Sequence, residues 1–227
     1  MANTPNMPFL SNLYSRIYRR VRDEFFPKIH PFDQMNGVDT SGRLNLRRLA
    51  IASTNRKYGR DYQGVEPGRF YDALAEIHEN FSIYTFVDLG CGKGRALMMA
   101  HELGFRRVIG VEFSLRLVEI AQKNLARLQL KSVQLLVQDV ANFRFPDEPL
   151  VVFTFNSFGP EILKQVLLNL RTHKQPLYFV YVNALHDSII RTDQFLNPLA
   201  RTDFHSVWNR QWVCAPSETE QHLDAVT

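Results

Sequence analysis

From residue 84 onward, short runs rich in β-branched and aromatic residues alternate with longer stretches of helical periodicity. The runs that predict strands are 84–89, 107–112, 133–138, 150–155 and 177–182. The intervening stretches that predict helices are roughly 93–103, 114–129, 160–171 and 185–198. Nearly continuous apolar strands separated by amphipathic helices are typical of a parallel sheet that is covered on both faces. The chain is therefore predicted to have an α/β fold.

Beyond residue 200 the pattern changes, and we expect a hairpin with 203–209 and 211–215 as its arms. This hairpin would add an antiparallel pair at one edge of the sheet. Upstream, 69–79 predicts a helix that leads into the first strand, whereas 31–67 is expected to be loop with short helical pieces. The expected architecture is a Rossmann-like, doubly wound mixed sheet.

The N-terminal part of the chain differs from the rest in charge. Residues 1–60 contain 11 Lys and Arg against 4 Asp and Glu, whereas the whole chain of 227 residues has a net charge of only +4. Residues 10–25 predict an amphipathic helix with four arginines on its polar side, ended by Pro27 and Pro31. We therefore divide the chain into a basic N-terminal extension over 1–67, containing this helix and a loop or lid, and a ligand-binding domain over 68–227.

Composition and cysteine content exclude several classes of protein. Hydrophobic residues make up 45% of the chain, which is typical of a folded protein rather than a disordered one. Cys91 and Cys214 are too few for a disulfide framework, and no metal site is predicted, because no cluster of His, Cys and Asp has the spacing of metal ligands. No apolar run reaches the roughly 20 residues that cross a bilayer. We expect a cytoplasmic protein.

The segment 86–95, at the end of the first predicted strand, carries the strongest functional signal. It contains Gly90, Gly92 and Gly94, with the small Cys91 tolerated between the first two. Glycines at a strand-to-helix turn allow a ligand to approach the backbone closely. Their spacing differs from the G-x-G-x-x-G of dinucleotide-binding enzymes, so a nicotinamide-dependent oxidoreductase is disfavoured.

Two carboxylates narrow the class of ligand further. Asp88 lies two residues before the first glycine, where it favours a cationic amine and would repel a pyrophosphate. Glu112 ends the second predicted strand, where an acidic side chain can bind both ribose hydroxyls. Together they favour a nucleoside that carries positive charge.

The segments 88–95, 108–113 and 138–139 resemble the successive cofactor motifs of class I S-adenosylmethionine-dependent methyltransferases. The resemblance implies the seven-stranded sheet of that class and S-adenosyl-L-methionine as the cofactor. By that resemblance, Asp88 and the Gly90–Gly94 backbone surround the methionyl part. Glu112 would hold the ribose, Phe113 would pack against the adenine, and Asp139 would accept from the adenine amino group.

A narrower resemblance covers residues 37 to about 186. The segments GVDTSGR at 37–43 and YVNALH at 181–186 look like those of a family of small, mostly uncharacterised bacterial methyltransferases with an N-terminal extension. This chain has Ser157 and Ala184 where that family usually has proline. The resemblance supports the cofactor assignment and supplies no acceptor, and the role of 37–43 is left open.

The fourth predicted strand ends in Asn156-Ser157-Phe158-Gly159-Pro160, at the sheet edge where ligands bind. The string resembles the Asn-Pro-Pro-aromatic signature of amino-group methyltransferases, without its prolines. It also resembles a segment of the histone-lysine methyltransferases that lack a SET domain. We therefore expect Asn156 and Phe158 to be catalytic and favour nitrogen methylation of a protein side chain or small molecule. The alternative is that Asn156 caps the following helix.

Further candidates have competing structural interpretations. Tyr62, with Tyr58 and Gln63, is expected to fold over the cofactor as a lid, although packing is the commoner role of such tyrosines. His186 is a candidate general base, with a loop or cap role as the alternative.

A second function class also stays open from the sequence. In this alternative the protein is a cofactor-binding module without catalysis, whose basic N-terminal arm docks on an anionic membrane or on nucleic acid. For the arm itself, we favour packing on its own domain over either contact, because a helix with one apolar face usually buries that face.

Overall fold

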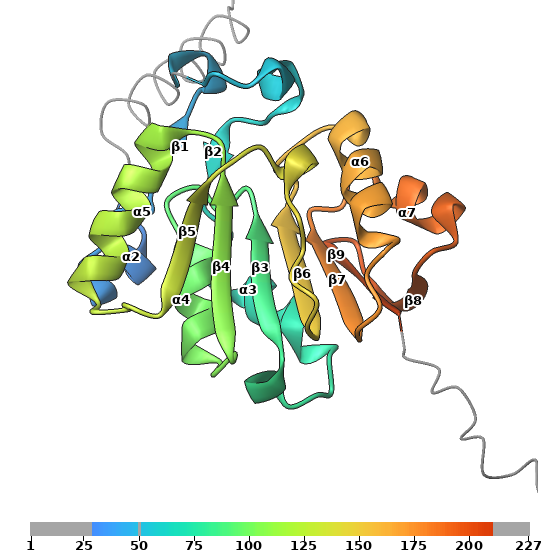
Figure 1. Ribbon diagram of the computed structural model, residues 1–227. Helices are drawn as coiled ribbons and strands as arrows, with labels where there is room; N and C mark the ends of the chain where they lie inside the picture. The colour runs from blue at the N-terminus through green and yellow to red at the C-terminus, as the bar shows by residue number, and fades with distance from the viewer. Residues whose placement is uncertain (1–28, 50, 211–227) are drawn as a thin grey trace, which may run out of the picture.

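A seven-stranded mixed sheet forms the centre of the molecule in the computed structural model, which describes residues 29–49 and 51–210 (Figure 1). Its parallel strands are β3 Thr85–Leu89, β4 Arg107–Glu112, β5 Val133–Val137, β6 Leu150–Phe155 and β7 Leu177–Val182. The antiparallel strands β8 Asn197–Arg201 and β9 His205–Arg210 complete the order β5-β4-β3-β6-β7-β9-β8. The predicted α/β, Rossmann-like mixed sheet is confirmed.

Helices cover both faces of the sheet. One face packs against α3 Pro67–Ala75 and α4 Arg95–Glu102, together with part of α5 Leu115–Arg127. The other face packs against α6 Pro160–Leu170, α7 Asp187–Asp193 and the short helix η4 Val140–Asn142. A further short helix, η3 Phe81–Ile83, precedes the first strand of the sheet. The reversal of strand order beside β3 places the ends of the parallel strands around a crevice, where ligands bind in such sheets.

The segment upstream of α3 is more ordered than the sequence predicts. It contains the helix α2 Pro31–Asn36 and the short helices η1 Leu46–Arg48 and η2 Thr54–Tyr58. It also contains a two-stranded antiparallel sheet of β1 Arg43–Leu44 and β2 Tyr62–Gln63. Figure 1 shows β1 and β2 at the end of the molecule to which the parallel strands point. We call residues 43–65 the roof, because they lie over this end of the sheet.

Two predictions about elements need correction. The hairpin has its arms at 197–201 and 205–210, not at 203–209 and 211–215, and the helix predicted over 185–198 ends at Asp193. The first arm is an edge strand with mostly exposed side chains, so it lacks the apolar alternation of a buried strand. Pro198, which is tolerated in an edge strand, further weakens the strand signal of this segment in the sequence. The predicted second arm, 211–215, lies outside the described residues.

The predicted amphipathic helix over 10–25 also lies outside the described residues. Pro31, which we expected to help end that helix, occupies the first turn of α2, where its fixed φ and missing N–H cost nothing. Among the helices that the structure describes, none is both long enough and apolar enough to cross a membrane.

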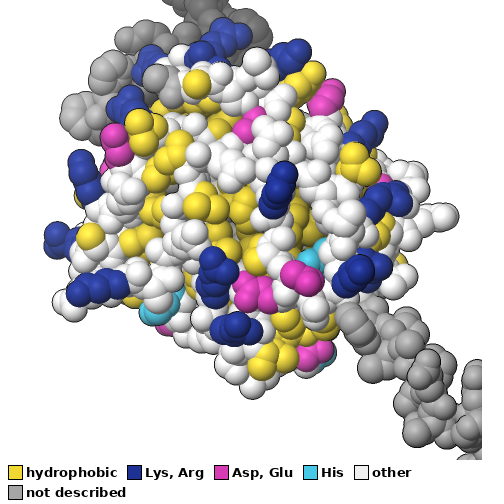
Figure 2. Space-filling view, in the orientation of Figure 1, with side chains coloured by type: hydrophobic (Ala, Val, Ile, Leu, Met, Phe, Trp, Pro, Cys, Tyr) yellow, Lys and Arg dark blue, Asp and Glu magenta, His cyan; other side chains and the backbone are white. Residues whose placement is uncertain are grey.

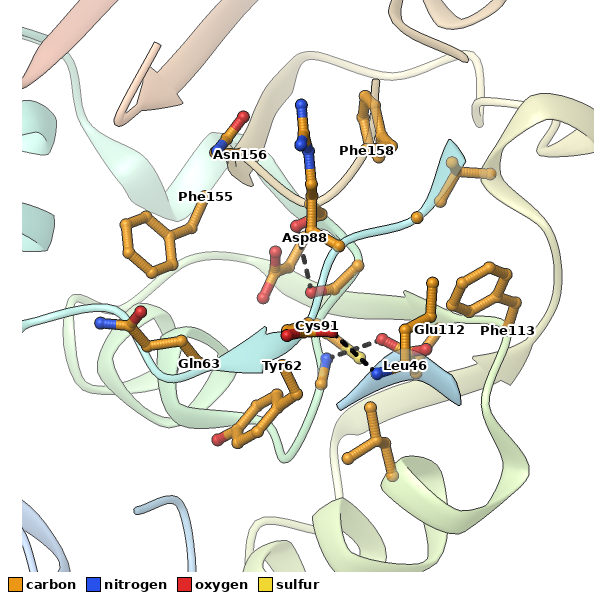
Figure 3. Close-up of a pocket in the computed structure, with 18 of the residues that line it drawn as sticks. Leu46, Tyr62, Gln63, Asp88, Cys91, Glu112, Phe113, Phe155, Asn156 and Phe158 are labelled. Carbon is orange, nitrogen blue, oxygen red and sulfur yellow. Dashed lines mark hydrogen bonds between the residues drawn. The ribbon is translucent and has the colours of Figure 1, made fainter. Parts of the chain in front are cut away.

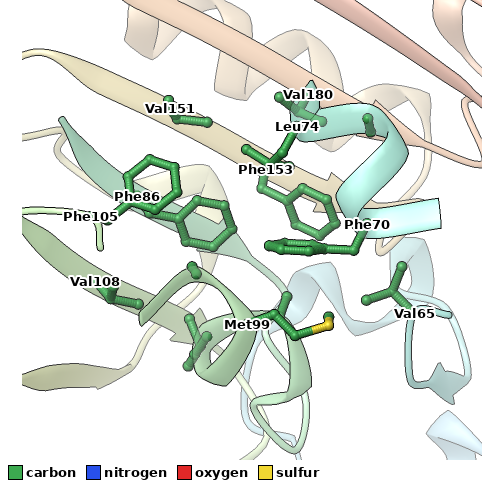
Figure 4. Close-up of a cluster of buried hydrophobic side chains, with 14 of the residues drawn as sticks. Val65, Phe70, Leu74, Phe86, Met99, Phe105, Val108, Val151, Phe153 and Val180 are labelled. Carbon is green, nitrogen blue, oxygen red and sulfur yellow. The ribbon is translucent and has the colours of Figure 1, made fainter. Parts of the chain in front are cut away.

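A cluster of aromatic rings holds α3 on the sheet (Figure 4). Phe70 of α3 is completely buried and makes edge-to-face contacts with Phe86 of β3 and Phe153 of β6. Phe86 in turn packs against Phe105, which follows α4. Because aromatic side chains each bury a large apolar area, these contacts anchor the segment that connects the roof to the first strand.

We predict that Phe70→Ala lowers the free energy of unfolding by about 3–5 kcal/mol, because the substitution leaves a cavity among rings that cannot close over it. Urea denaturation measures the change. Leu168→Ala is the control, since Leu168 is 57% exposed, and we expect it to change stability by no more than about 0.5 kcal/mol. Equal effects of the two substitutions would contradict the packing described here.

Candidate functional site

A cavity of about 510 Å³ lies between the roof and the carboxyl ends of the central strands. Ten of the eleven predicted site residues line it: Tyr62, Asp88, Gly90, Cys91, Gly92, Glu112, Phe113, Asp139, Asn156 and Phe158. Gly94 does not line the cavity but is the N-cap of α4. The structure therefore brings together residues from β3, β4, the segment after β5 and the segment after β6.

The loop from Gly90 to Gly94, which we call the glycine loop, requires glycine at two positions for the same two reasons. Gly90 has a φ of 85°, and a Cβ there would lie 2.4 Å from the Cβ of Ser157. Gly92 has a φ of 55°, and a Cβ there would lie 2.4 Å from the ring of Tyr62. Both positions thus combine a left-handed backbone with close contact, so the loop cannot accept side chains without displacing its neighbours.

Asp88 and Glu112 are two buried carboxylates on adjacent strands, with exposed fractions of 3% and 4%. Glu112 accepts hydrogen bonds from the backbone N–H groups of Gly92, at 3.1 Å, and Ser114, at 2.9 Å. The carboxylate of Asp88 accepts no hydrogen bond from any residue that the structure describes. A buried carboxylate without a partner is costly in an empty site and is relieved by a ligand that brings a donor or a positive charge.

Burial raises the pKa of both carboxyl groups. Burial, and then the neighbouring charge of Glu112, raise the pKa of Asp88 well above its ordinary value. Burial raises the pKa of Glu112 to about 7, although hydrogen bonds from backbone N–H groups oppose the shift. The thiol of Cys91 is also shifted, because burial and the two carboxylates raise its pKa well above the usual range. A thiol held in its protonated form is no nucleophile.

Asp139 lines the cavity, but its carboxylate is engaged by the protein. One oxygen caps η4 by accepting from the N–H of Ala141 at 2.9 Å. The other accepts from the hydroxyl of Ser53 and from the side-chain amide of Asn55, the latter at 2.9 Å. Asp139 therefore connects η2 of the roof to the end of β5. Its contact with an adenine amino group stays a prediction and would use the remaining lone pairs of the carboxylate.

The segment 37–43, whose role the sequence left open, fixes the roof to the glycine loop. Asp33 accepts from the N–H and hydroxyl of Thr40 and from the hydroxyl of Ser41. The guanidinium of Arg95, which is 4% exposed, donates to the hydroxyl and the carbonyl of Thr40 and lies 3.7 Å from Asp33. Burial alone would raise the pKa of Asp33, but these hydrogen bonds and the charge of Arg95 lower it.

Lys93 of the glycine loop and Tyr62 of the roof are both bonded to the segment 37–43, which thereby connects the two. The ammonium of Lys93 donates to the carboxylate of Asp39 at 2.7 Å and to the carbonyl of Ser41 at 2.8 Å. The hydroxyl of Tyr62 donates to the carbonyl of Thr40 at 2.7 Å, and burial raises its pKa. Tyr62 therefore lies over Gly92 as a fixed part of the roof, in the place where we expected a lid.

Asn156 and Phe158 follow β6 and line the cavity, and Figure 3 shows Asn156 across Asp88 from Glu112 and Phe113. Asn156 has a φ of 44° and accepts a hydrogen bond from the hydroxyl of Tyr181 at 3.3 Å. It does not cap α6, because Gly159 is the N-cap residue of that helix. Phe158 is buried, and its backbone forms an antiparallel bridge with the roof.

The remaining residues that the sequence suggested for the site differ in whether they line the cavity. Gln63 lines the cavity, whereas Tyr58 packs against the apolar cluster beneath α6. His186 lies just outside the cavity lining, and its Nε2 receives a hydrogen bond from Arg60 at 3.2 Å. Arg60 could not be singled out from the sequence, because it lies in a predicted loop that contains several arginines and no motif marks it. Among the described residues, no group of three or more His, Cys, Asp or Glu is arranged to hold a metal ion.

Residues 86–176 match the methyltransferase domain family. The methyltransferase domain match begins in β3 and includes the glycine loop, Glu112 and Asn156. No curated protein matches the chain.

Two similar solved structures are described as methyltransferases or methylases. A proposed RNA methyltransferase from Pyrococcus horikoshii is 17% identical, with a TM-score of 0.52, over 75% of this chain and 94% of that one. A protein described as a predicted N6-adenine-specific DNA methylase from Listeria monocytogenes is 15% identical, with a TM-score of 0.51, over 66% of this chain. The match spans 53% of the Listeria protein. At these identities the likeness shows a shared fold.

We predict a pH dependence of stability that comes from Glu112. Its pKa is about 7 in the folded protein and near 4.5 in the unfolded chain, so the folded state holds a proton that the unfolded state releases. The stabilisation that protonated Glu112 gives the folded state is complete below pH 4.5 and is lost as the pH rises to about 7. Relative to Glu112→Gln, wild-type stability should therefore fall by up to about 3 kcal/mol between pH 5 and 8 in denaturation experiments. Parallel pH profiles would contradict the assignment.

We also predict that Arg95→Met lowers the free energy of unfolding by about 3–5 kcal/mol, because it leaves Asp33 buried without its cation. The matched control is Arg107→Met, which removes an ion pair between Arg107 and Glu148 at the surface. We expect that control to cost less than about 1 kcal/mol. Thermal or urea denaturation of both variants makes the comparison, and a cost for Arg95→Met as small as that of the control would refute the role given to Arg95.

Proposed function

We propose that the protein is an S-adenosylmethionine-dependent methyltransferase that acts on a nitrogen atom. The observation that carries the proposal is the buried Asp88 carboxylate, which has no hydrogen-bond donor among the described residues and lies in a cavity beside the glycine loop. A cofactor with an ammonium group would provide the missing partner. The match of residues 86–176 to the methyltransferase domain family supports the same conclusion.

The residues around the cavity fit this cofactor in shape as well as in charge. Gly90 and Gly92 line the cavity, and because they lack side chains, Ser157 and Tyr62 pack directly against the backbone of the loop at the cavity wall. Glu112 already accepts two backbone hydrogen bonds, and its oxygens retain lone pairs for the hydroxyls of a ribose. Phe113 lines the same part of the cavity and offers an apolar ring surface for a base.

The cofactor, when bound, would supply an electrophilic methyl group for in-line transfer to the lone pair of an acceptor, and the electrons of the broken S–C bond would stay with the demethylated cofactor as the leaving group. The protein's own task is then to orient the acceptor and to exclude water. The side-chain carbonyl of Asn156 uses one lone pair for the hydroxyl of Tyr181, and its second lone pair is available to an acceptor N–H. Phe155 and Phe158 line the cavity on either side of Asn156 in the sequence and provide apolar walls. These features support nitrogen as the acceptor atom.

Binding of the cofactor is the first test. We predict that S-adenosylmethionine and its demethylated product raise the melting temperature of the wild-type protein, because a ligand that binds only the folded state stabilises it. Asp88→Asn should weaken binding of both ligands about tenfold or more in calorimetry, since it removes the charged partner of the ammonium group. Glu119→Gln, which removes an exposed carboxylate on α5, should leave binding unchanged. The absence of any stabilisation of the wild type by either ligand would refute the proposed function.

A further inference from the structure

We propose that the methyl acceptor carries an anionic group, a carboxylate or a phosphate, which Arg60 binds at the β6–β7 side of the cavity. This inference rests on the proposed methyltransferase function and concerns the second substrate of the same site.

Three contacts place Arg60 between the ends of β6 and β7. Its backbone N–H donates to the carbonyl of Ser157, the residue directly after Asn156, at 3.1 Å. Its guanidinium donates through Nη2 to Nε2 of His186, which follows the end of β7, at 3.2 Å. The preceding residue, Gly59, forms the antiparallel bridge with Phe158. Arg60 is thus held by its backbone to the loop that contains Asn156.

The carboxylates that the central sheet contributes to the cavity all lie on one side of it. The buried carboxylates of Asp88 and Glu112, and that of Asp139, belong to β3, β4 and the segment after β5. Figure 3 shows Glu112 on one side of Asp88, with Asn156 on the other. The acidic side suits a cationic cofactor. The strand ends of β6 and β7 contribute no carboxylate to the described lining of the cavity. The roof contributes Asp61, whose carboxylate accepts from the N–H of Leu46 at 2.9 Å, and the arginines Arg43 and Arg60, of which Arg60 contacts the β6–β7 side.

The guanidinium of Arg60 keeps most of its hydrogen-bonding capacity. It has five N–H donors, and its one side-chain partner among the described residues is the ring of His186. Burial, and then the charge of Arg60, lower the pKa of His186, which keeps the ring neutral so that Nε2 accepts this bond. No carboxylate in the described part of the chain pairs with Arg60. An arginine with free donors beside a cavity matches the geometry of a carboxylate or phosphate.

Two asparagines extend the donor surface beside Arg60. Asn156 and Asn183 are the first residues after β6 and β7, both line the cavity, and both have positive φ values, 44° and 53°. Such a conformation is uncommon for residues other than glycine, and its occurrence at two adjacent strand ends beside a cavity is typical of binding sites. The side-chain carbonyl of Asn156 accepts from Tyr181, and its amide N–H groups donate to no residue that the structure describes, so they remain as donors. The surface therefore offers donors to an anion.

The sharpest test measures binding to protein saturated with the demethylated cofactor. Benzoate and phenyl phosphate serve as probes, with benzamide as the neutral analogue, and isothermal calorimetry reports each affinity. We expect at least one anion to bind tenfold or more tightly than benzamide. The preferred anion shows which group the acceptor carries. Equal affinities for the three probes, or no binding of either anion, would overturn the inference.

Substitutions test whether the preference for an anionic probe over benzamide depends on Arg60. Arg60→Gln should abolish the difference between the anion and benzamide, and Arg60→Lys should retain part of it because the charge remains. Lys57→Gln is the matched control, since it removes a positive charge from the same segment outside the cavity lining, and it should behave as wild type. If Arg60→Gln instead weakens binding of the demethylated cofactor and leaves the probe preference intact, then Arg60 serves the cofactor and the inference is wrong.

A second experiment uses methyl transfer itself. Labelled S-adenosylmethionine is incubated with the protein and a fractionated cell extract, and the labelled product is passed over an anion exchanger at pH 8. Retention of the product, with loss of its formation in Arg60→Gln, supports the inference. A labelled product that the exchanger does not retain overturns it while leaving the methyltransferase function in place. Failure of the wild type to bind either form of the cofactor refutes the proposed function, and the inference with it.

Discussion

The buried contact of Arg95 with Asp33 and Thr40 joins two parts of the chain on which the whole cavity depends. Arg95 begins the helix after the glycine loop, whereas Asp33 and Thr40 lie more than 50 residues upstream. The guanidinium satisfies acceptors that would otherwise be buried without donors. It also donates to the carbonyl of Val65 at 3.1 Å and so joins the roof to the helix that follows the glycine loop.

Much of the fold follows from the sequence because its signals are local. The five parallel strands lie within one residue of their predicted ends, since buried strands are continuous apolar runs bounded by turns. The hairpin was misplaced because β8 is an exposed edge strand. The short sheet of β1 and β2 was missed because its two residues per strand carry no periodicity. Such elements are stabilised by contacts with distant residues, which a single sequence does not display.

The candidate site shows the same contrast. Asp88, the glycines and Glu112 were predictable because their place at strand ends follows from the order of the strands. The roles of Thr40 and Arg60 were not predictable, since Thr40 depends on Arg95 and Arg60 on His186, both far away in the sequence.

Figure 2 shows Lys and Arg side chains mostly around the margin of one face, with hydrophobic side chains gathered nearer its middle. Net charge alone therefore reveals little about which arginine contacts a ligand.

The attachment of the roof has a consequence for the order of events at the site. The roof is fixed on three sides: to the segment 37–43 through Tyr62, to the end of β5 through Asp139, and to the loop after β6 through Arg60. A cofactor bound among the carboxylates would lie beneath this structure, whereas an acceptor at Arg60 would lie nearer its margin. Exchange of the cofactor would then require a slow local opening that exchange of the acceptor does not. Such an architecture favours an ordered kinetic scheme in which the cofactor enters first and its product leaves last.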